Sequence, residues 1–461
     1  MPKRRVAKVT YPVQPESWAT FVREPLEESL SVVDLFCGAG GLAEGFRQAG
    51  FSITAGLDSD PDAIATFSRN FPAARPILGD IRAADVRAEL AEILPGASVL
   101  VGGPPCQAFS QVRNHSRIID DPRNHLYKEF VAALGVARPL AFVMENVTGI
   151  DQMGAREQIV ADLCLHGEYE VSPQILDAAD FGVPQTRRRL FFIGLRKDLA
   201  AAPLELSGSG ATDAAELTRV VADGRIRYQI AVCEGLFKRV SGPLADPMDD
   251  RVVTAADAIS DLSGLPAGNR EDHIAYSSLP QPRSAYQRKM RVGGGDLLLN
   301  VQVPRINADT AQRLANIPSG GNHRDLPDHL LDRYLSGQRW GQENGSGRLS
   351  RKHFYAYRRL HPDIWAWTLN TKADSVYHYD RMRSLSVREF ARLQSFPDRF
   401  VFVTDERKGL VAGRHDGGPA HSRYRQVGNA VPPLLALAVA KEMHKALAAS
   451  HRRLSIHART A

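Results

Sequence analysis

Short apolar runs alternate with amphipathic stretches between residues 31 and 194, and this alternation limits the possible folds more than any other feature of the chain. Val32–Phe36 is typical of a buried strand, and Gly41–Ala49 has the spacing of a helix. The same pattern predicts strands at Ile53–Leu57, Val99–Val101, Leu140–Met144 and Leu190–Gly194, and a helix at Pro61–Asn70. Strands and helices that alternate over short connections form a parallel sheet with helices on both faces. The predicted fold class is therefore α/β.

The alternation fades after residue 197, which predicts a second, smaller and irregular domain with Gly and Pro clusters such as Gly293–Gly295. Helical periodicity returns at Ser386–Gln394, and a final helix is expected at Pro433–Ala448. We divide the chain into an N-terminal extension (1–30), a first domain (31–197), the irregular domain (198–380), a helix with a linker (381–419) and a C-terminal segment that completes the first domain (420–461).

Cysteine spacing and apolar content exclude several classes of protein. The four cysteines lie far apart and form no Cys-x-x-Cys pair, so we predict neither a disulfide framework nor a metal site. The longest apolar stretch near a terminus, Ala430–Ala440, is too short to span a bilayer. The basic start of the chain is not followed by the apolar segment of a signal peptide, so we expect a cytoplasmic protein.

Positive charge is concentrated in the irregular domain. The net charge of the chain is +6, but residues 281–360 hold 14 Arg and Lys residues against 6 Asp and Glu residues. Such a surface can follow a phosphate backbone, or it can simply be a basic surface in solvent. Charge alone leaves both interpretations open.

A glycine loop, Asp34–Gly41, follows the first predicted strand and begins a helix. Its glycines allow a ligand to approach the backbone at the positive end of that helix. Asp58, at the end of the second strand, can accept hydrogen bonds from ribose hydroxyls, and Asp80 is suited to an adenine amino group. Together these residues favour a nucleoside cofactor over a plain tight turn. They do not distinguish a nicotinamide cofactor from S-adenosylmethionine.

A single thiol and a carboxylate follow two further strands. Cys106 stands in Gly102–Ser110 directly after an apolar strand, and two prolines precede it. We therefore expect it at the carboxyl edge of the sheet, where ligands of open α/β folds bind. A lone cysteine is most often a small buried apolar residue, but a turn of polar and restricted residues favours a reactive role. Glu145 ends the next strand, where it either points to the same edge or caps a helix.

These segments belong to seven motifs in a fixed order: Asp34–Gly41, Gly79–Asp80, Gly102–Ser110, Glu145–Val147, Gln185–Arg189, Arg388–Pro397 and Gln426–Pro433. With them the sequence resembles the cytosine-C5 DNA methyltransferase family, over residues 31–195 and 381–445, or roughly half of the chain. The resemblance implies a Rossmann-like sheet of the S-adenosylmethionine-dependent methyltransferases. It also implies that residues 198–380 are a target-recognition domain.

The resemblance further implies a covalent mechanism. Cys106 attacks C6 of cytosine, which makes C5 nucleophilic, and Glu145 gives a hydrogen bond or a proton to N3. Arg189 contacts O2 of the base, and Arg187 supports the Glu145 carboxylate. C5 then takes the methyl group of S-adenosylmethionine, and loss of the C5 proton releases Cys106. The residues implied to hold the cofactor are Phe36, Gly38, Gly40, Gly41, Asp58, Asp80, Ile81, Pro104 and Asn429.

Double-stranded DNA is the substrate that the resemblance implies. A cytosine inside a duplex hides C6, so its nucleotide must leave the stack, and residues 107–124 are expected to close over it. Arg388–Pro397 reads as an amphipathic helix with Phe390, Leu393 and Phe396 on its core face, and it is implied to organise the recognition domain. We expect a monomer without membrane contact, in a prokaryotic restriction-modification or defence system with cognate restriction or defence proteins.

Three other functions stay open from the sequence. A tRNA cytosine methyltransferase shares the catalytic motifs, although the long recognition domain favours duplex DNA. A non-catalytic nucleic-acid-binding module could keep the fold, but the presence of Cys106, Glu145 and both arginines argues against it. A nicotinamide-dependent oxidoreductase shares the sheet and has no role for the Pro-Pro-Cys motif.

Overall fold

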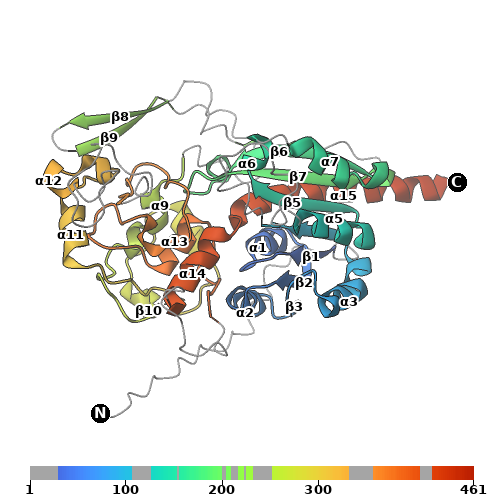
Figure 1. Cartoon of the computed structure of the whole chain (residues 1–461), viewed down its shortest axis with the longest axis horizontal. Coiled ribbons are helices and arrows are strands. Elements are labelled where there is room, and N and C mark those ends of the chain that lie inside the picture. Colours follow the sequence, from blue (N-terminus) through green and yellow to red (C-terminus); the bar gives the residue numbers. More distant parts are fainter. Residues whose placement is uncertain are drawn as a thin grey trace, which may run out of the picture.

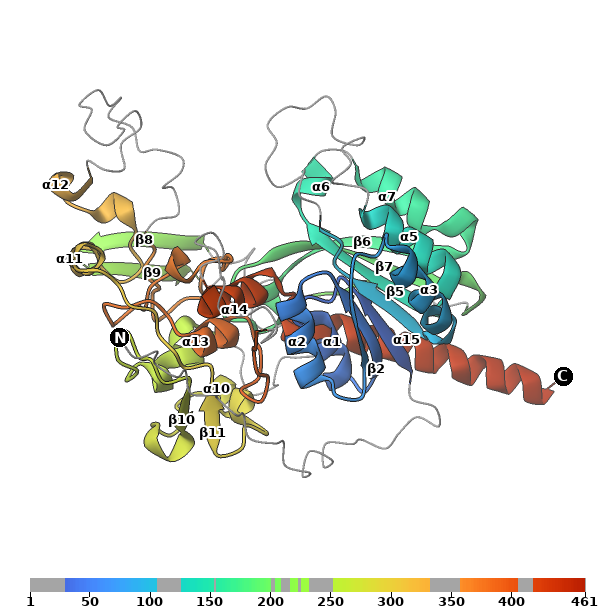
Figure 2. The ribbon, with the colours of Figure 1, turned by 60° about the horizontal axis from the view of Figure 1, so that its bottom comes forward.

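Two lobes make up the molecule, as Figures 1 and 2 show. This computed structural model describes residues 30–105, 126–152, 155–199, 204–208, 216–222, 225–231, 252–331, 357–404 and 418–460. The sheet lobe contains the N-terminal part of the described chain and its last helix, and the irregular lobe contains most of what lies between them. Of the predicted extension, residues 1–29 lie outside the described residues.

A seven-stranded sheet is the centre of the sheet lobe, with the order β3-β2-β1-β4-β5-β7-β6. The strands are β1 (Ser31–Leu35), β2 (Ser52–Asp58), β3 (Arg75–Leu78), β4 (Val99–Gly102), β5 (Ala141–Val147), β6 (Tyr169–Asp177) and β7 (Arg188–Arg196). Strands β3, β2, β1, β4 and β5 pair in parallel, whereas β7 runs antiparallel to β5 and β6. The predicted α/β class is confirmed.

Helices cover both faces of this sheet. On one face lie α1 (Gly41–Gln48), α2 (Pro61–Asn70) and α15 (Pro433–Thr460), and on the other lie α3 (Ala84–Ile93), α5 (Leu126–Ala137) and α7 (Arg156–Leu163). Successive strand residues alternate between the two apolar cores, so that Val32 packs into one and Val33 into the other. Because both faces are covered, the central strands are continuous apolar runs in the sequence.

The last helix, α15, packs against α1, the helix that follows the glycine loop. A Cβ atom on Gly45 of α1 would lie 2.4 Å from Cβ of Ala436 and 2.6 Å from the backbone nitrogen of Leu437. The two helix backbones therefore approach closely only because residue 45 has no side chain. Helix α15 continues to Thr460, well beyond the predicted end at Ala448. Among the helices of the described residues, none has the length and apolar character that a membrane crossing requires.

Short elements with long connections form the irregular lobe. They are the strands β8 (Glu216–Ala222), β9 (Arg225–Ala231), β10 (His273–Ala275) and β11 (Leu297–Leu299), and the helices α9 (Ala255–Ile259), α10 (Ala285–Arg291), α11 (Ala308–Ala315), α12 (Asp328–Leu331) and α13 (Val387–Leu393). A small helix, α6 (Gly149–Gln152), follows β5 in the sheet lobe. Helix α14 (Gly418–Asn429) contacts α13 on one side and α2 on the other, so it joins the two lobes.

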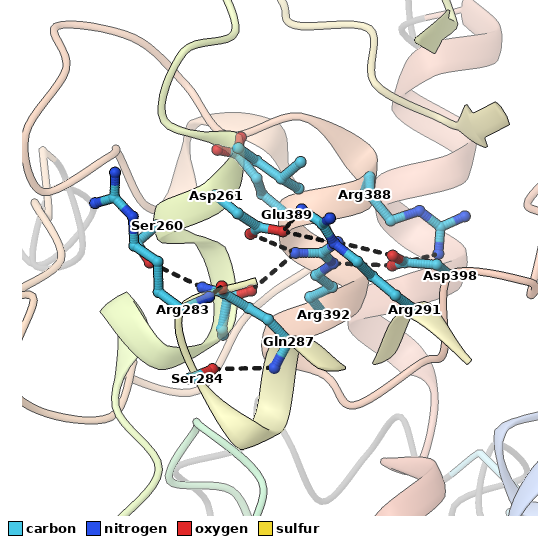
Figure 3. A network of polar contacts seen from close by, with 12 residues as sticks. Ser260, Asp261, Arg283, Ser284, Gln287, Arg291, Arg388, Glu389, Arg392 and Asp398 are labelled. Carbon is cyan, nitrogen blue, oxygen red and sulfur yellow. Dashed lines mark hydrogen bonds and ion pairs between the residues drawn. The ribbon is translucent and has the colours of Figure 1, made fainter. Parts of the chain in front are cut away.

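The prediction of an amphipathic helix over residues 388–397 is wrong in length and in character. Helix α13 ends at Leu393, and Ser395 then takes a left-handed backbone conformation with φ 64°. Phe396 lies beyond the helix, and every residue of α13 is buried. Charged side chains of the helix are buried because they form ion pairs with neighbouring segments: Glu389 pairs with Arg383, and Arg392 pairs with Asp261 and Asp398. Figure 3 shows the pairs of Arg392.

Candidate active site

A cleft of about 720 Å³ opens at the carboxyl edge of the parallel strands. Its walls come from the residues that follow β1 to β5, from the start of β7, from residues 368–371 and from the end of α14. This volume is typical of sites for small organic ligands, which are about 300–1,000 Å³. The sequence-predicted site residues in its lining are Phe36, Gly38, Gly41, Asp58, Asp80, Ile81, Pro104, Glu145, Arg187, Arg189 and Asn429.

Two predicted site residues are not part of this lining. Gly40 precedes α1 with φ 97°, and a Cβ atom there would lie 2.5 Å from the ring of Phe71, so this glycine serves the turn and its packing. Cys106 lies outside the described residues. Pro104 and Pro105, which precede it directly, both line the cleft.

Asp58 ties the end of β2 to the glycine loop. Its carboxylate accepts hydrogen bonds from the backbone N–H groups of Gly38 and Asp60, both at 2.8 Å. Burial raises the pKa of Asp58, and these backbone donors partly oppose that effect. A carboxylate has about four acceptor positions, so Asp58 can take further hydrogen bonds from a diol such as a ribose. The residues present at this wall therefore fit a nucleoside.

Asp80, predicted beside an adenine, has a charged partner in this structure. Its carboxylate accepts hydrogen bonds from Nε of Arg82 at 2.9 Å and from Nη2 at 2.6 Å. The hydrogen bonds from Arg82 lower the pKa of Asp80 to about 2. Both side chains are about half exposed, so Arg82 can yield one acceptor position to a ligand at little cost.

Glu145 projects from β5 toward the cleft and pairs with Arg189. Nε of Arg189 lies 3.0 Å from Oε1 of Glu145. The antiparallel register places Arg189 opposite Val147, two residues beyond Glu145, so the two side chains are diagonal neighbours on one sheet face. Burial raises the pKa of Glu145, and the charges of Arg189 and Arg187 oppose this rise without cancelling it. The protonated carboxyl is thus more favoured here than in solvent.

Arg187 occupies a different position from the one expected. The resemblance assigns it to the Glu145 carboxylate, but its guanidinium donates to the backbone carbonyls of Gly428 (2.9 Å) and Leu369 (3.3 Å). Burial lowers the pKa of Arg187 well below its ordinary value. The direct partner of Glu145 is Arg189, and Arg187 acts on that carboxyl only through its charge.

Several lining residues were not assigned from the sequence. Asn146 donates to the carbonyl of Pro104 at 3.0 Å, which joins the end of β5 to the Pro-Pro turn. Residues 368–371 reach the cleft because the side chain of Gln185 accepts a hydrogen bond from the backbone N–H of Leu369 at 2.8 Å. Arg425 lines the cleft from α14. Asn146 could have been predicted from the sequence, because it lies in the Glu145–Val147 motif. Residues 368–371 belong to no motif and could not.

The fold and the cleft define an α/β methyltransferase, a class that in general uses S-adenosylmethionine. The sequence profile described as C-5 cytosine-specific DNA methylase matches residues 30–445, and the chain belongs to that family. The resemblance seen in the motifs is therefore confirmed, and the family is one of enzymes.

Individual relatives extend over most of the chain. The type II methyltransferase M1.HphI of Haemophilus parahaemolyticus is 31% identical over 90% of this chain and 87% of its own length. The type II methyltransferase M.AgeI of Thalassovita gelatinovora is 30% identical over 91% of this chain and 100% of its own length. A crystal structure described as a DNA modification methyltransferase encoded within an E. coli prophage superposes with a TM-score of 0.61, over 91% of this chain and 99% of that one. At 23% identity that likeness shows the fold.

Proposed function

We propose that this chain binds S-adenosylmethionine and transfers its methyl group to C5 of a cytosine that has left a DNA duplex. One observation carries the proposal: the Glu145–Arg189 pair, the Asp58 carboxylate and Pro105, the residue before Cys106, all line one cleft. A base-binding group and a ribose-binding group therefore face the same space as Pro105, which directly precedes Cys106 in the sequence.

Cys106 is the proposed nucleophile. Its thiolate forms a bond to C6 of the cytosine, and the electron pair of the C5–C6 double bond moves toward C5 and the ring. S-adenosylmethionine, when bound, supplies an electrophilic methyl group that C5 can take. Loss of the C5 proton to solvent then restores the C5–C6 double bond and breaks the C6–S bond. The thiolate of Cys106 is regenerated.

Glu145 and Arg189 are the proposed partners of the cytosine ring. Glu145 donates a hydrogen bond or a proton to N3, which relieves the negative charge that builds up as the thiolate attacks. The raised pKa of Glu145 supports this role because it favours the protonated form. Arg189 already lies beside that carboxyl, so its guanidinium can reach the neighbouring O2 of the same base edge. Arg187 holds residues 369 and 428 in place behind the pair.

The cofactor is assigned to other parts of the cleft lining. Asp58 accepts the ribose hydroxyls, Asp80 receives the adenine amino group once Arg82 yields an acceptor position, and Asn429 lies by the methionine part. Phe36, Gly38, Gly41, Ile81 and Pro104 line the remaining surface, and Gly40 shapes the loop. Residues 198–380 are the proposed target-recognition domain, with their arginines on DNA phosphates.

The biological setting is proposed from the relatives. Several are named type II methyltransferases, so we propose a restriction-modification role for a monomer acting on chromosomal DNA in the cytoplasm. Bisulfite sequencing of DNA from a methylation-deficient host that expresses the chain checks this proposal and reports the target sequence. A host genome that gains no 5-methylcytosine contradicts it.

Transfer of a labelled methyl group tests the chemistry directly. With S-adenosylmethionine as donor, we expect labelled duplex DNA with the wild-type chain and none with Cys106→Ser, because the serine hydroxyl is a much weaker nucleophile at neutral pH. Duplexes with 5-fluorocytosine at the target should trap the wild-type chain covalently, since fluorine cannot leave as the C5 proton does. Labelling of transfer RNA and not of DNA would move the assignment to a tRNA cytosine methyltransferase. Full turnover by Cys106→Ser would end the covalent mechanism.

A further inference from the structure

Three carboxylates crowd the start of α2, next to the proposed ribose site. Three aspartates, Asp58, Asp60 and Asp62, lie within five residues, and hydrogen bonds to the backbone link them in sequence. Asp58 accepts from the N–H of Asp60, and Oδ1 of Asp60 accepts from the N–H of Asp62 at 3.0 Å, which caps α2. The position of the Asp58 carboxylate therefore depends on the position of Asp60.

Arg425 crosses from α14 to this acidic turn. Its Nη2 donates to Oδ2 of Asp60 at 2.8 Å and lies 4.0 Å from a carboxylate oxygen of Asp62. Arg425 lines the cleft together with Asp58 and Asp60, and its side chain is 34% exposed to solvent. The proposed mechanism gives it no role.

Arg425 also stands one helical turn before Asn429, the residue proposed for the methionine part of the cofactor. Residues four apart lie on the same face of a helix, and both of these residues line the cleft. The Arg425–Asp60 pair thus spans the space between two walls: the turn that carries Asp58 and the end of α14 that carries Asn429.

We propose that Arg425 is a cofactor-positioning residue, which acts through Asp60 to hold the Asp58 turn at a set distance from Asn429. This inference rests on the proposed binding of S-adenosylmethionine in the cleft. The pair fixes the groups assigned to the ribose and to the methionine part of one ligand, so its loss lowers the affinity for that ligand and leaves the reacting groups around Glu145 in place.

Other contacts keep α14 on α2 when Arg425 is changed. Ser422 donates to Asp62 at 2.5 Å, and the hydroxyl of Thr66 donates to the side-chain oxygen of Gln426 at 2.6 Å, both buried. An ion pair that is about one third exposed contributes little to folding compared with such buried contacts. A change at Arg425 is therefore expected to act locally, on the geometry of the cleft.

Helix α14 offers a control two residues away, in an ion pair of similar length that is more deeply buried. Arg423 pairs with Asp272 at 2.7 Å, close to the 2.8 Å of the Arg425–Asp60 pair, but it points to the irregular lobe and is not in the cleft lining. Asp60→Asn complements it, because asparagine still caps a helix while it loses the charge that attracts Arg425.

Calorimetric titration of the full chain with S-adenosylmethionine, without DNA, tests the proposal. We expect Arg425→Gln to raise the dissociation constant about three- to fivefold, and Arg425→Lys to restore most of the affinity because an ammonium can still pair with Asp60. Arg423→Gln should bind like the wild type. In methyl-transfer assays, Arg425→Gln should raise KM for S-adenosylmethionine by the same factor and leave kcat within about twofold.

Coupling to Asp60 distinguishes positioning from direct contact. In an Asp60→Asn background, Arg425→Gln should cause no further loss of affinity, since the pair is already broken. Wild-type affinity in Arg425→Gln, or independent losses from the two changes, overturns the inference alone. A wild-type chain that binds no S-adenosylmethionine overturns the proposed function and this inference with it.

Discussion

At the residue scale, Glu145 shows how burial and charge compete in the cleft. Burial raises its pKa more than the nearby guanidinium groups of Arg189 and Arg187 lower it. Glu145 was singled out from the sequence because it ends a strand in a recognisable motif. Its direct pairing with Arg189 could not be predicted, because the choice between Arg187 and Arg189 depends on the register of β7 against β5.

This balance predicts a pH-dependent effect of Glu145→Gln. A carboxyl whose pKa is raised on folding contributes stability that is complete below its unfolded pKa of about 4.3 and is lost as the pH rises through the folded pKa. Glutamine does not titrate, so the stability of the variant relative to wild type should increase as the pH rises above the unfolded pKa of about 4.3. Urea unfolding below that pH and at neutral pH measures the difference, and an unchanged difference contradicts the prediction. Methyl transfer should fall by about 10²- to 10⁴-fold, as when a general acid is lost.

At the scale of elements, the contact between α1 and α15 rests on Gly45. Alanine is about 1 kcal/mol better than glycine in a helix interior, yet here its Cβ would meet Ala436 at 2.4 Å. We therefore expect Gly45→Ala to destabilise the fold by about 1–3 kcal/mol through overpacking. Gly135 on α5 is the control, because a Cβ there meets nothing within 4 Å and alanine should stabilise by up to about 1 kcal/mol. Thermal unfolding of both variants checks this prediction: the melting temperature should fall for Gly45→Ala and should not fall for Gly135→Ala. A shift of the same sign in both variants would contradict it.

The elements that could be predicted are those buried on both sides. Strands β1, β2, β4, β5 and β7 are central, and their apolar runs gave positions within a few residues. The two strands of this sheet that were not predicted, β3 and β6, are its edges. They carry exposed or half-exposed residues along most of their length, as edge strands do, and so lack an apolar signal. The prediction of an amphipathic helix at α13 was wrong for the opposite reason. Its charged residues indicated an exposed face, but they are buried in ion pairs.

At the scale of the whole molecule, the two lobes meet along a strip of backbone, residues 401–403. The side chain of Asn70 bonds both the N–H and the C=O of Val401, and the hydroxyl oxygen of Thr66 accepts a hydrogen bond from the N–H of Val403 at 2.9 Å. Between them, Asn300 of the irregular lobe bonds both groups of Phe402 at 2.8–2.9 Å. Contacts between residues more than 100 apart leave no local pattern in the sequence. The walls of the cleft that come from residues 368–371 and from Arg425 were missed for the same reason.

The buried ion cluster around Arg392 joins α13 to the segments that carry Asp261 and Asp398 inside the irregular lobe, as Figure 3 shows. Arg392 lies 2.7 Å from Asp398 and 2.6 Å from Asp261, and all three side chains are fully buried. Arg392→Met leaves two buried carboxylates without the cation between them, so we expect it to lower the free energy of unfolding by about 3–5 kcal/mol. Arg291 also pairs with Asp261 but is partly exposed, and Arg291→Gln leaves Arg392 in place.

The comparison of these two variants separates a buried cation from an ordinary ion pair. Urea unfolding should show a loss of about 1 kcal/mol or less for Arg291→Gln, because Asp261 keeps its fully buried partner, Arg392. Equal losses of unfolding free energy in both variants would mean that Asp261 and Asp398 find other partners when the Arg392 guanidinium is removed. The larger loss for Arg392→Met would show that the lobe is held by charges that solvent cannot screen, so the same difference should persist in high salt.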